Sequence, residues 1–306
     1  MQKSYIAHSV FVVPPTGFRC NEQTKESNAY QHEGKDNLIE KRAINEWNGL
    51  VTLLQENGIK TNICYSPSSE NTPDGCFPNN WVSIHPESNK IVFYPMCAPN
   101  RRLERTKEAV DKIKALHPGY EVIDLSSRVE QGRFLEGTGS LVIDRNKKFA
   151  IMCASVRSHQ ALAKEWAAAL EYELFVFDAV GPKGIPVYHT NVIFAFGETF
   201  CVGCFESITD PAKREELIAI LSNRLDKQVI PISVSQVEQF CGNILQLQRT
   251  TDQTLILCMS TRSYEAFTPA QREALSRHGE IVHTAIPTIE DIGGGGVRCL
   301  LAEMFE

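Results

Sequence analysis

The stretch GGGGVRCLLA, residues 293–302, decides the fold, because its apolar second half is a strand that only the beginning of the chain can complete. Glycine lacks a side chain and tolerates positive φ, so four consecutive glycines let the backbone pack tightly around a bound group. Cys299 follows them and lies seven residues from the C-terminus, so the fold must fix its position. A thiol held in this way is a nucleophile when its pKa is lowered or a base takes its proton, whereas the alternative is a buried structural cysteine.

One pattern recurs along the chain: strand, tight turn, strand, amphipathic helix, strand. In its first copy, the strands Trp81–Ile84 and Ile91–Tyr94 form a hairpin, and a helix over Arg102–Leu116 precedes a third strand over Tyr120–Leu125. Turn residues and a change from alternating to helical periodicity mark the other copies. The five copies begin near Asn80, Gly139, Asn191, Asn243 and Val297. Their spacing of roughly 50 to 60 residues is near the range that is typical of propellers and repeat arrays.

The fifth copy is split between the two ends of the chain. Val297–Ala302 supplies its first strand, and the strand Ile6–Val13, the helix Asn37–Glu56 and the strand Lys60–Cys64 supply the rest. Termini that complete one shared repeat close an array into a ring and remove its exposed ends. We therefore predict an α/β fold, a five-bladed α/β propeller of five ββαβ-type repeats whose N- and C-termini share one blade, as a single catalytic domain over residues 1–306. The tight turns disfavour a doubly wound sheet, because they pair strands antiparallel.

The composition excludes several classes of function. A formal net charge of -6 argues against nucleic acid or an anionic membrane surface as a partner, since either would require a basic face. No stretch approaches the ~20 apolar residues of a membrane helix. We expect no signal peptide, and ten cysteines without an export signal indicate free thiols in a reducing cytoplasm. Cys201 and Cys204 form a lone CxxC pair, so we expect no zinc site and no other metal.

Closure of the ring would bring the beginnings of the first strands together at one mouth of a central channel. These positions hold Asn80, Glu136, His189, Asn191, Asn243 and Cys299. A thiol, an imidazole, a carboxylate and amides from separate repeats supply a nucleophile, a general acid/base, an orienting acid and polar binding groups. The sequence therefore predicts an active site at this mouth.

The same residues lie in motifs that resemble those of the guanidino-group-modifying enzymes: arginine deiminases, dimethylarginine hydrolases and amidinotransferases. That family has the five-bladed pentein fold, and the resemblance covers nearly the whole chain. Gly294–Cys299 resembles its catalytic-cysteine loop, His189–Asn191 its catalytic histidine and a substrate-contacting residue, and Leu135–Thr138 the segment whose carboxylate orients the histidine. Pro78–Trp81 resembles the acidic strand of the family. Arg101 and Arg157 match arginines that hold the substrate, so the resemblance makes them candidates for binding the substrate carboxylate.

Two departures from the family pattern indicate the branch. Deiminases carry acidic residues where this chain has Asn80 and Asn191. A guanidinium has only donors and a positive charge, so it requires carboxylates, whereas a neutral ureido group also carries an acceptor oxygen that an amide can match. Two buried carboxylates that face a neutral ligand would cost several kcal/mol. The resemblance is therefore to the citrulline-utilisation hydrolases, which Phe18–Thr24 also resembles.

The sequence thus predicts a cysteine-dependent hydrolase of linear C–N bonds that converts citrulline to ornithine, ammonia and carbon dioxide through a covalent S-linked intermediate. We expect the Cys299 thiolate to attack the ureido carbon, and His189 to protonate the departing nitrogen and then to activate water. Glu136 would fix the tautomer of His189 and favour its protonated form, while Asn80 and Asn191 bind the ureido group. No cofactor is expected.

Several alternatives stay open at this stage. The same fold could act on a guanidino substrate, as an arginine deiminase, dimethylarginine hydrolase or amidinotransferase. A non-catalytic binding propeller is a further alternative, since a fold alone does not confer activity. The polar segment Thr16–Asn37 is either a lid or an ordinary loop. A homodimer is expected only because symmetric dimers are common.

Overall fold

The computed structural model describes residues 5–32, 34 and 38–305, which form five three-stranded sheets. The second strand of every sheet lies in the middle, antiparallel to the first strand and parallel to the third. This is the arrangement that the predicted hairpin and helical crossover require. In sheet order, the strands are β3 (Val82–His85), β4 (Lys90–Phe93) and β5 (Glu121–Asp124); β6 (Val142–Asp144), β7 (Phe149–Cys153) and β8 (Glu173–Phe177); β9 (Phe194–Phe196), β10 (Phe200–Gly203) and β11 (Gln228–Pro231); β12 (Leu245–Gln248), β13 (Leu255–Ser260) and β14 (Glu280–Thr284); and β15 (Ala302–Met304), β1 (Ser9–Val12) and β2 (Lys60–Ile63).

The fifth sheet joins the two ends of the chain, as predicted. In β1, Phe11 lies opposite Ala302 of β15, and on its other side it lies opposite Asn62 of β2. The predicted strand Val297–Ala302 is shorter in the structure, because Val297–Leu300 forms a 3-10 turn and β15 begins at Ala302. The predicted start of the following helix, Asn37, lies outside the described residues.

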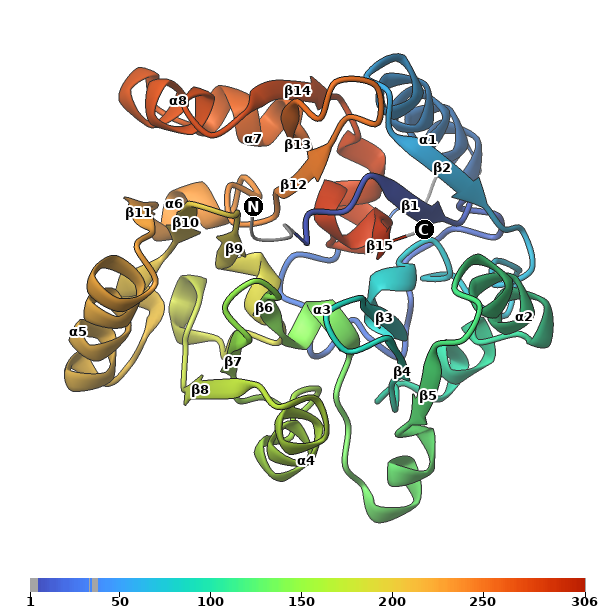
Figure 1. The fold of residues 1–306 in the computed structure, drawn as a ribbon. Helices are drawn as coiled ribbons and strands as arrows, with labels where there is room; N and C mark the ends of the chain where they lie inside the picture. The colour runs from blue at the N-terminus through green and yellow to red at the C-terminus, as the bar shows by residue number, and fades with distance from the viewer. Residues whose placement is uncertain (1–4, 33, 35–37, 306) are drawn as a thin grey trace.

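The long helices lie on the outside of the ring of sheets, the short helix Gly137–Ser140 lies near its centre, and the sheets follow one another around it in chain order (Figure 1). First strands of neighbouring sheets contact each other: β15 contacts β3, and β9 contacts both β6 and β12. The helices are α1 (Ile39–Glu56), α2 (Lys107–Leu116), α3 (Gly137–Ser140), α4 (Gln160–Leu170), α5 (Pro211–Ala219), α6 (Val234–Val237), α7 (Thr261–Ala266) and α8 (Pro269–Ser276).

Local sequence explains why the long helices begin and end where they do. The predicted helix Arg102–Leu116 is divided, because Pro99–Glu104 forms a 3-10 helix and the Thr106 side chain accepts from the backbone N–H of Ala109 at the start of α2. Thr268 begins α8 with a capping box. Each outer helix buries one apolar face: α1 buries Trp47 and five smaller side chains at helical spacing.

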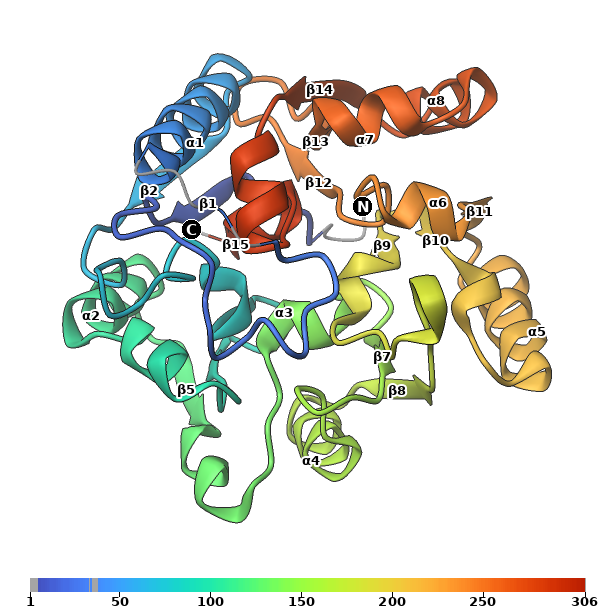
Figure 2. The same ribbon diagram turned by 180° about the vertical axis from the view of Figure 1, so that it is seen from behind.

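A short helical turn precedes the first strand in four of the five sheets. These turns are Pro78–Asn80, α3, Thr190–Val192 and Val297–Leu300. The turn Pro78–Asn80 contacts both α3 and Val297–Leu300, and α3 also contacts Thr190–Val192. The predicted entry positions therefore lie in or beside helical turns that pack together. The blue segment that follows β1 crosses this region beside the red C-terminal turns (Figure 2). None of the helices in the described ranges is long and apolar enough to cross a bilayer.

Candidate functional site

The glycine run places Cys299 in a buried turn against two amides. Its sulfur accepts hydrogen bonds from Nδ2 of Asn243 at 3.3 Å and Nδ2 of Asn191 at 3.6 Å. Gly294 has a φ of 63°, and a Cβ at Gly296 would lie 2.7 Å from Oδ1 of Asn243, so glycine is required at both positions. Burial raises the pKa of the Cys299 thiol, although the hydrogen bond from Asn243 and the charge of Arg298 lower it. The thiol is therefore protonated near neutral pH.

Glu136 and His189 form a hydrogen-bonded pair beside this turn. Nε2 of His189 lies 2.8 Å from Oε2 of Glu136, whose Oε1 accepts from the backbone N–H of Cys97 at 3.0 Å. Glu136 precedes α3 and His189 precedes Thr190–Val192, and the contact between these two turns brings the side chains together. The structure thus brings the predicted acid/base residue and its orienting carboxylate into direct contact.

Burial and nearby charges together set the protonation state of this pair. Burial would raise the pKa of Glu136, but the charge of Arg157, the hydrogen bond with His189 and the charge of Arg101 lower it to about 2. Burial lowers the pKa of His189 to about 4, because the hydrogen bond and charge of Glu136 only partly offset the loss of solvation. The resting imidazole is therefore neutral because burial outweighs the effect of Glu136, which, as predicted, favours the protonated form by raising the pKa of His189. The Nε2–H group donates to Glu136, and Nδ1 keeps its lone pair.

The neighbouring guanidinium fixes the orientation of the Asn80 amide. Nη1 of Arg101 donates to Oδ1 of Asn80 at 2.8 Å, while Nε and Nη2 donate to the two oxygens of Glu104 at 2.8 and 3.0 Å. A Cβ at Gly139 would lie 2.4 Å from Nδ2 of Asn80 and 2.7 Å from Nδ1 of His189, so both nitrogens face this glycine. Nδ2 of Asn80 is buried and has no hydrogen-bond partner among the described residues.

Asn191 and Asn243 present the opposite kind of unpaired group. Both side chains donate a hydrogen bond from Nδ2 to the sulfur of Cys299, and Nδ2 of Asn243 also donates to the backbone oxygen of Asn191 at 2.9 Å. Their Oδ1 atoms are buried and, within the described part of the chain, accept no hydrogen bond. Buried polar atoms are rarely left in this state unless a ligand, ion or water meets them. The site therefore holds one unpaired donor and two unpaired acceptors around Cys299.

Arg157 connects Glu136 to the loop that crosses the site, residues 16–32, which we call the covering segment (Figure 2). Its Nε and Nη2 donate to Oγ of Ser27 at 3.0 and 2.6 Å, and Nη2 also donates to the backbone oxygen of Thr24 at 2.9 Å. Its Nη1 lies 3.7 Å from Oε2 of Glu136, and its guanidinium carbon lies 4.7 Å from the centre of the Tyr188 ring. Most N–H donors of Arg101 and Arg157 thus contact protein groups in this structure. That these arginines bind the substrate carboxylate stays a prediction.

Sequence reasoning missed Asp74, a buried carboxylate next to Arg101. Its Oδ2 accepts from Nδ2 of Asn21 at 2.7 Å and from Oγ1 of Thr24 at 3.1 Å, whereas its Oδ1 is buried without a partner among the described residues. Asp74 lies in a Pro-Asp-Gly sequence that is typical of an ordinary turn, so nothing local marks it. The sequence did place Asn243 at an entry position, but it gave no indication of the contact with Cys299.

Comparisons with known proteins identify the family and the fold. The family described as N,N dimethylarginine dimethylhydrolase, eukaryotic, matches residues 14–306. Comparison with curated protein sequences gave no match. The solved N-terminal domain of ArgZ, an arginine dihydrolase from the ornithine-ammonia cycle in cyanobacteria, has a TM-score of 0.75 and 16% identity, with coverage of 97% of this chain and 98% of that domain.

Two further structures show the same fold. Unliganded AgrE has a TM-score of 0.76 and 17% identity, with coverage of 97% of this chain and 39% of AgrE. DDAH from Pseudomonas aeruginosa, solved as a mutant in complex with citrulline, has a TM-score of 0.68 and 16% identity, with coverage of 98% of this chain and 100% of that chain. In the apo structure of ArgZ, this chain covers 40% of the ArgZ chain. Together with the family match over residues 14–306, these findings place the chain in the dimethylarginine dimethylhydrolase family of guanidino-group-modifying hydrolases.

Proposed function

We propose that this protein is a cysteine-dependent hydrolase that cleaves the ureido group of citrulline to ornithine, ammonia and carbon dioxide. The observation that carries the proposal is the pair of unpaired buried groups beside Cys299: the donor Nδ2 of Asn80 and the acceptor Oδ1 of Asn191. A ureido group offers an acceptor oxygen and N–H donors, so it can satisfy both atoms.

A guanidinium fits this pair poorly for two reasons. It has only N–H donors, so it would place a donor against the Nδ2 group of Asn80. It also carries a charge that needs a buried carboxylate. Glu136 is already engaged by His189 and flanked by Arg157, and Asp74 lies 3.9 Å from the guanidinium of Arg101, so both carboxylates already face a cation. The neutral substrate needs no counter-charge at the reacting carbon.

The neutral imidazole supports a specific order of proton transfers. His189 accepts the thiol proton at Nδ1 as the sulfur of Cys299 attacks the ureido carbon, and Glu136 stabilises the imidazolium that forms. The imidazolium then protonates the departing nitrogen, which leaves an S-linked carbonyl intermediate. His189 next takes a proton from water, the resulting hydroxide attacks the carbonyl carbon, and the C–S bond breaks. The released carbamate decomposes to an amine and carbon dioxide, so one water molecule is consumed in all.

We assign different roles to the two arginines. Arg101 positions the Asn80 amide, because two hydrogen bonds that it donates to Glu104 hold its guanidinium in place. Arg157 binds the substrate carboxylate, which would replace Ser27 and the backbone oxygen of Thr24 as its acceptor. The segment Thr16–Asn37 would then act as a lid that moves when substrate binds.

The remaining expectations belong to the same proposal. We interpret the five sheets as the blades of a five-bladed α/β propeller, because their first strands contact one another around the site. We also propose a cytoplasmic protein with free thiols, without a metal, a cofactor or a nucleic-acid partner, that can form a homodimer.

Hydrolysis of arginine or of a methylated arginine is the second candidate, and the family match favours it. Incubation with citrulline, arginine, agmatine and methylated arginines distinguishes the two, with ornithine, citrulline and ammonia measured. We expect ornithine and ammonia from citrulline at the highest kcat/KM, and no turnover by Cys299→Ser. A tenfold preference for arginine over citrulline would overturn the proposal in favour of guanidino hydrolysis.

A further inference from the structure

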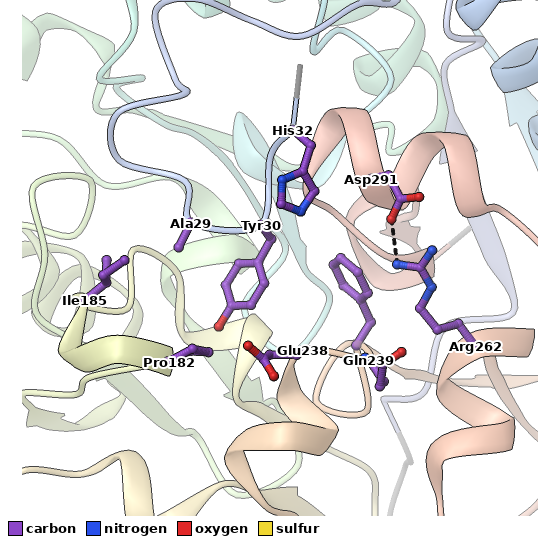
Figure 3. A pocket seen from close by; sticks show the side chains of 10 residues that line it. Ala29, Tyr30, His32, Pro182, Ile185, Glu238, Gln239, Arg262 and Asp291 are labelled. Carbon is purple, nitrogen blue, oxygen red and sulfur yellow. Dashed lines mark hydrogen bonds and ion pairs between the residues drawn. The ribbon is translucent and has the colours of Figure 1, made fainter. Parts of the chain in front are cut away.

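A cavity of about 350 Å³ lies beside residues 29–32 of the covering segment, away from the proposed catalytic residues. It has the size of small-molecule sites. Ala29–His32 of the covering segment form one wall, and Pro182, Ile185 and Glu238 lie along another (Figure 3). Cys299, His189 and Glu136 are not among its lining residues. None of the residues that carry out the proposed reaction therefore lines this cavity.

Two aromatic rings and a carboxylate meet at one corner of this cavity, where the guanidinium carbon of Arg262 already lies 6.0 Å from the centre of the Phe240 ring. The rings of Tyr30 and Phe240 lie 6.0 Å apart, with their planes at 54°. Figure 3 shows the hydroxyl of Tyr30 and the carboxylate of Glu238 pointing toward the same part of the cavity. An ammonium group is attracted both by aromatic faces and by a carboxylate. Such a corner thus suits a primary amine better than a neutral or anionic group.

The other charges that line the cavity are already balanced. Nη1 of Arg262 pairs with Oδ1 of Asp291 at 2.7 Å, and its Nε lies 3.1 Å from Oε2 of Glu290. Glu238, in contrast, has no ion pair or side-chain hydrogen bond within the described residues. Among the described side chains of the cavity, the unmatched charge is therefore negative.

We propose that this cavity binds the alkyl-ammonium group of a basic amino acid or a diamine. The ammonium group lies between Tyr30 and Glu238, and the methylene chain packs along Pro182 and Ile185. We further propose that the physiological ligand is ornithine. This choice rests on the proposed function, in which ornithine is the product. The binding site itself does not depend on that reaction.

A ligand here would hold the covering segment against the catalytic loop. The backbone N–H of His32 donates to the backbone oxygen of Asp291 at 2.7 Å, in the turn that leads to the glycine run. The Tyr30 ring lies 6.3 Å from that of Tyr188, whose hydroxyl donates to the backbone oxygen of Gly294 at 2.8 Å. Ligand binding therefore stabilises the covered state, and it inhibits turnover by slowing the exchange of substrate and product.

The test measures binding without turnover. Isothermal titration of the Cys299→Ser protein with 1,4-diaminobutane and with ornithine should show binding, and Glu238→Gln in that background should weaken the diamine at least tenfold, because a charge-assisted contact is lost. Glu215→Gln, at an exposed site on α5, is the control and should bind normally. Tighter binding of ornithine than of the diamine would identify the amino acid as the ligand. Absence of diamine binding, or diamine affinity that Glu238→Gln leaves unchanged, would overturn the inference.

Kinetics of the active enzyme give a second readout. Ornithine at the catalytic site competes with citrulline, whereas ornithine in the cavity also lowers kcat. We expect mixed inhibition of the wild type and purely competitive inhibition of Glu238→Gln, with kcat and KM unchanged in the absence of ornithine. Purely competitive inhibition of the wild type would refute inhibition through the cavity. If the protein binds the diamine through Glu238 but does not hydrolyse citrulline, the proposed function fails and the binding site stands.

Discussion

Nη1 of Arg101 donates a hydrogen bond to Oδ1 of Asn80 at 2.8 Å, and this contact determines which end of the amide faces the reacting groups. A guanidinium can only donate, so the amide oxygen must turn toward it and the NH₂ group must turn away. Arg101 is held in turn by Glu104. An aspartate at position 80 would also accept from Arg101, but it would offer no donor on its other side.

Replacement of the Asn80 amide by a carboxylate should therefore weaken the preference for citrulline over arginine. We expect Asn80→Asp to lower kcat/KM for citrulline by roughly tenfold or more, since the ureido oxygen loses its donor and meets a negative charge. Binding of arginine should improve relative to citrulline, although turnover of arginine need not follow, because transition-state fit is a stricter demand than binding. Steady-state kinetics on both substrates measure this, with Asn71→Asp at an exposed site as the control. Unchanged citrulline kinetics would refute the assignment of Asn80.

Replacement of the sulfur of Cys299 by an oxygen tests whether this residue is the nucleophile. Cys299→Ser should abolish turnover and leave the thermal unfolding temperature nearly unchanged, because the hydroxyl can take the place of the thiol against Asn191 and Asn243. Mass spectrometry of the wild type during turnover should detect a covalent adduct on Cys299. Cys64→Ser, at a buried thiol after β2 that lies 3.5 Å from Oγ of Ser66, is the matched control and should keep full activity. Turnover by the serine variant at the wild-type rate would exclude covalent catalysis by this residue.

Asn243 should control the ionisation of the thiol. Its Nδ2 stabilises the thiolate, so Asn243→Ala should raise the pKa of Cys299 further and lower kcat/KM about tenfold. The pH dependence of Cys299 alkylation reports this pKa directly, and its midpoint should move to higher pH in the variant. A variant with an unchanged alkylation profile and reduced stability would indicate a purely structural role for Asn243.

Burial of neutral His189 should make folding sensitive to mild acid. The pKa of His189 falls from 6.5 to about 4 on folding, so the unfolded chain binds this proton at a higher pH than the folded one does. The associated stability is fully present above about pH 6.5, is lost as the pH falls toward 4, and amounts to about 3 kcal/mol. Denaturant unfolding of wild type and His189→Gln between pH 7 and pH 4 measures it. Equal pH slopes for the two proteins would contradict the assigned neutral state.

Periodicity alone predicted much of the fold. Tight turns at fixed offsets from amphipathic helices indicated five copies of one unit, and the split copy predicted that β15 and β1 share a sheet. The same register predicted that Glu136 and His189 lie close together, although they are far apart in the sequence. Local patterns suffice here, because strand pairing and helix placement repeat in every copy.

The sequence could not predict properties that depend on burial or on long-range contacts. The neutral state of His189 results from a balance between lost solvation and nearby charges, which no local pattern records. Asp74 lies in a sequence typical of a turn, and only the folded chain places it beside Arg101. The late start of β15 has a similar cause, since the 3-10 turn before it is fixed by packing against Pro78–Asn80.

The pairing of β1 with β15 also has a consequence for biosynthesis. During translation β1 leaves the ribosome long before β15 exists, so one edge of β1 stays without its partner while nearly all of the chain is made. Pairing across so long a sequence separation is slow, and unpaired edges of this kind favour aggregation. The segment that relieves this exposure also carries Cys299, so a nascent chain gains the proposed nucleophile only when it also gains the strand that completes the fifth sheet.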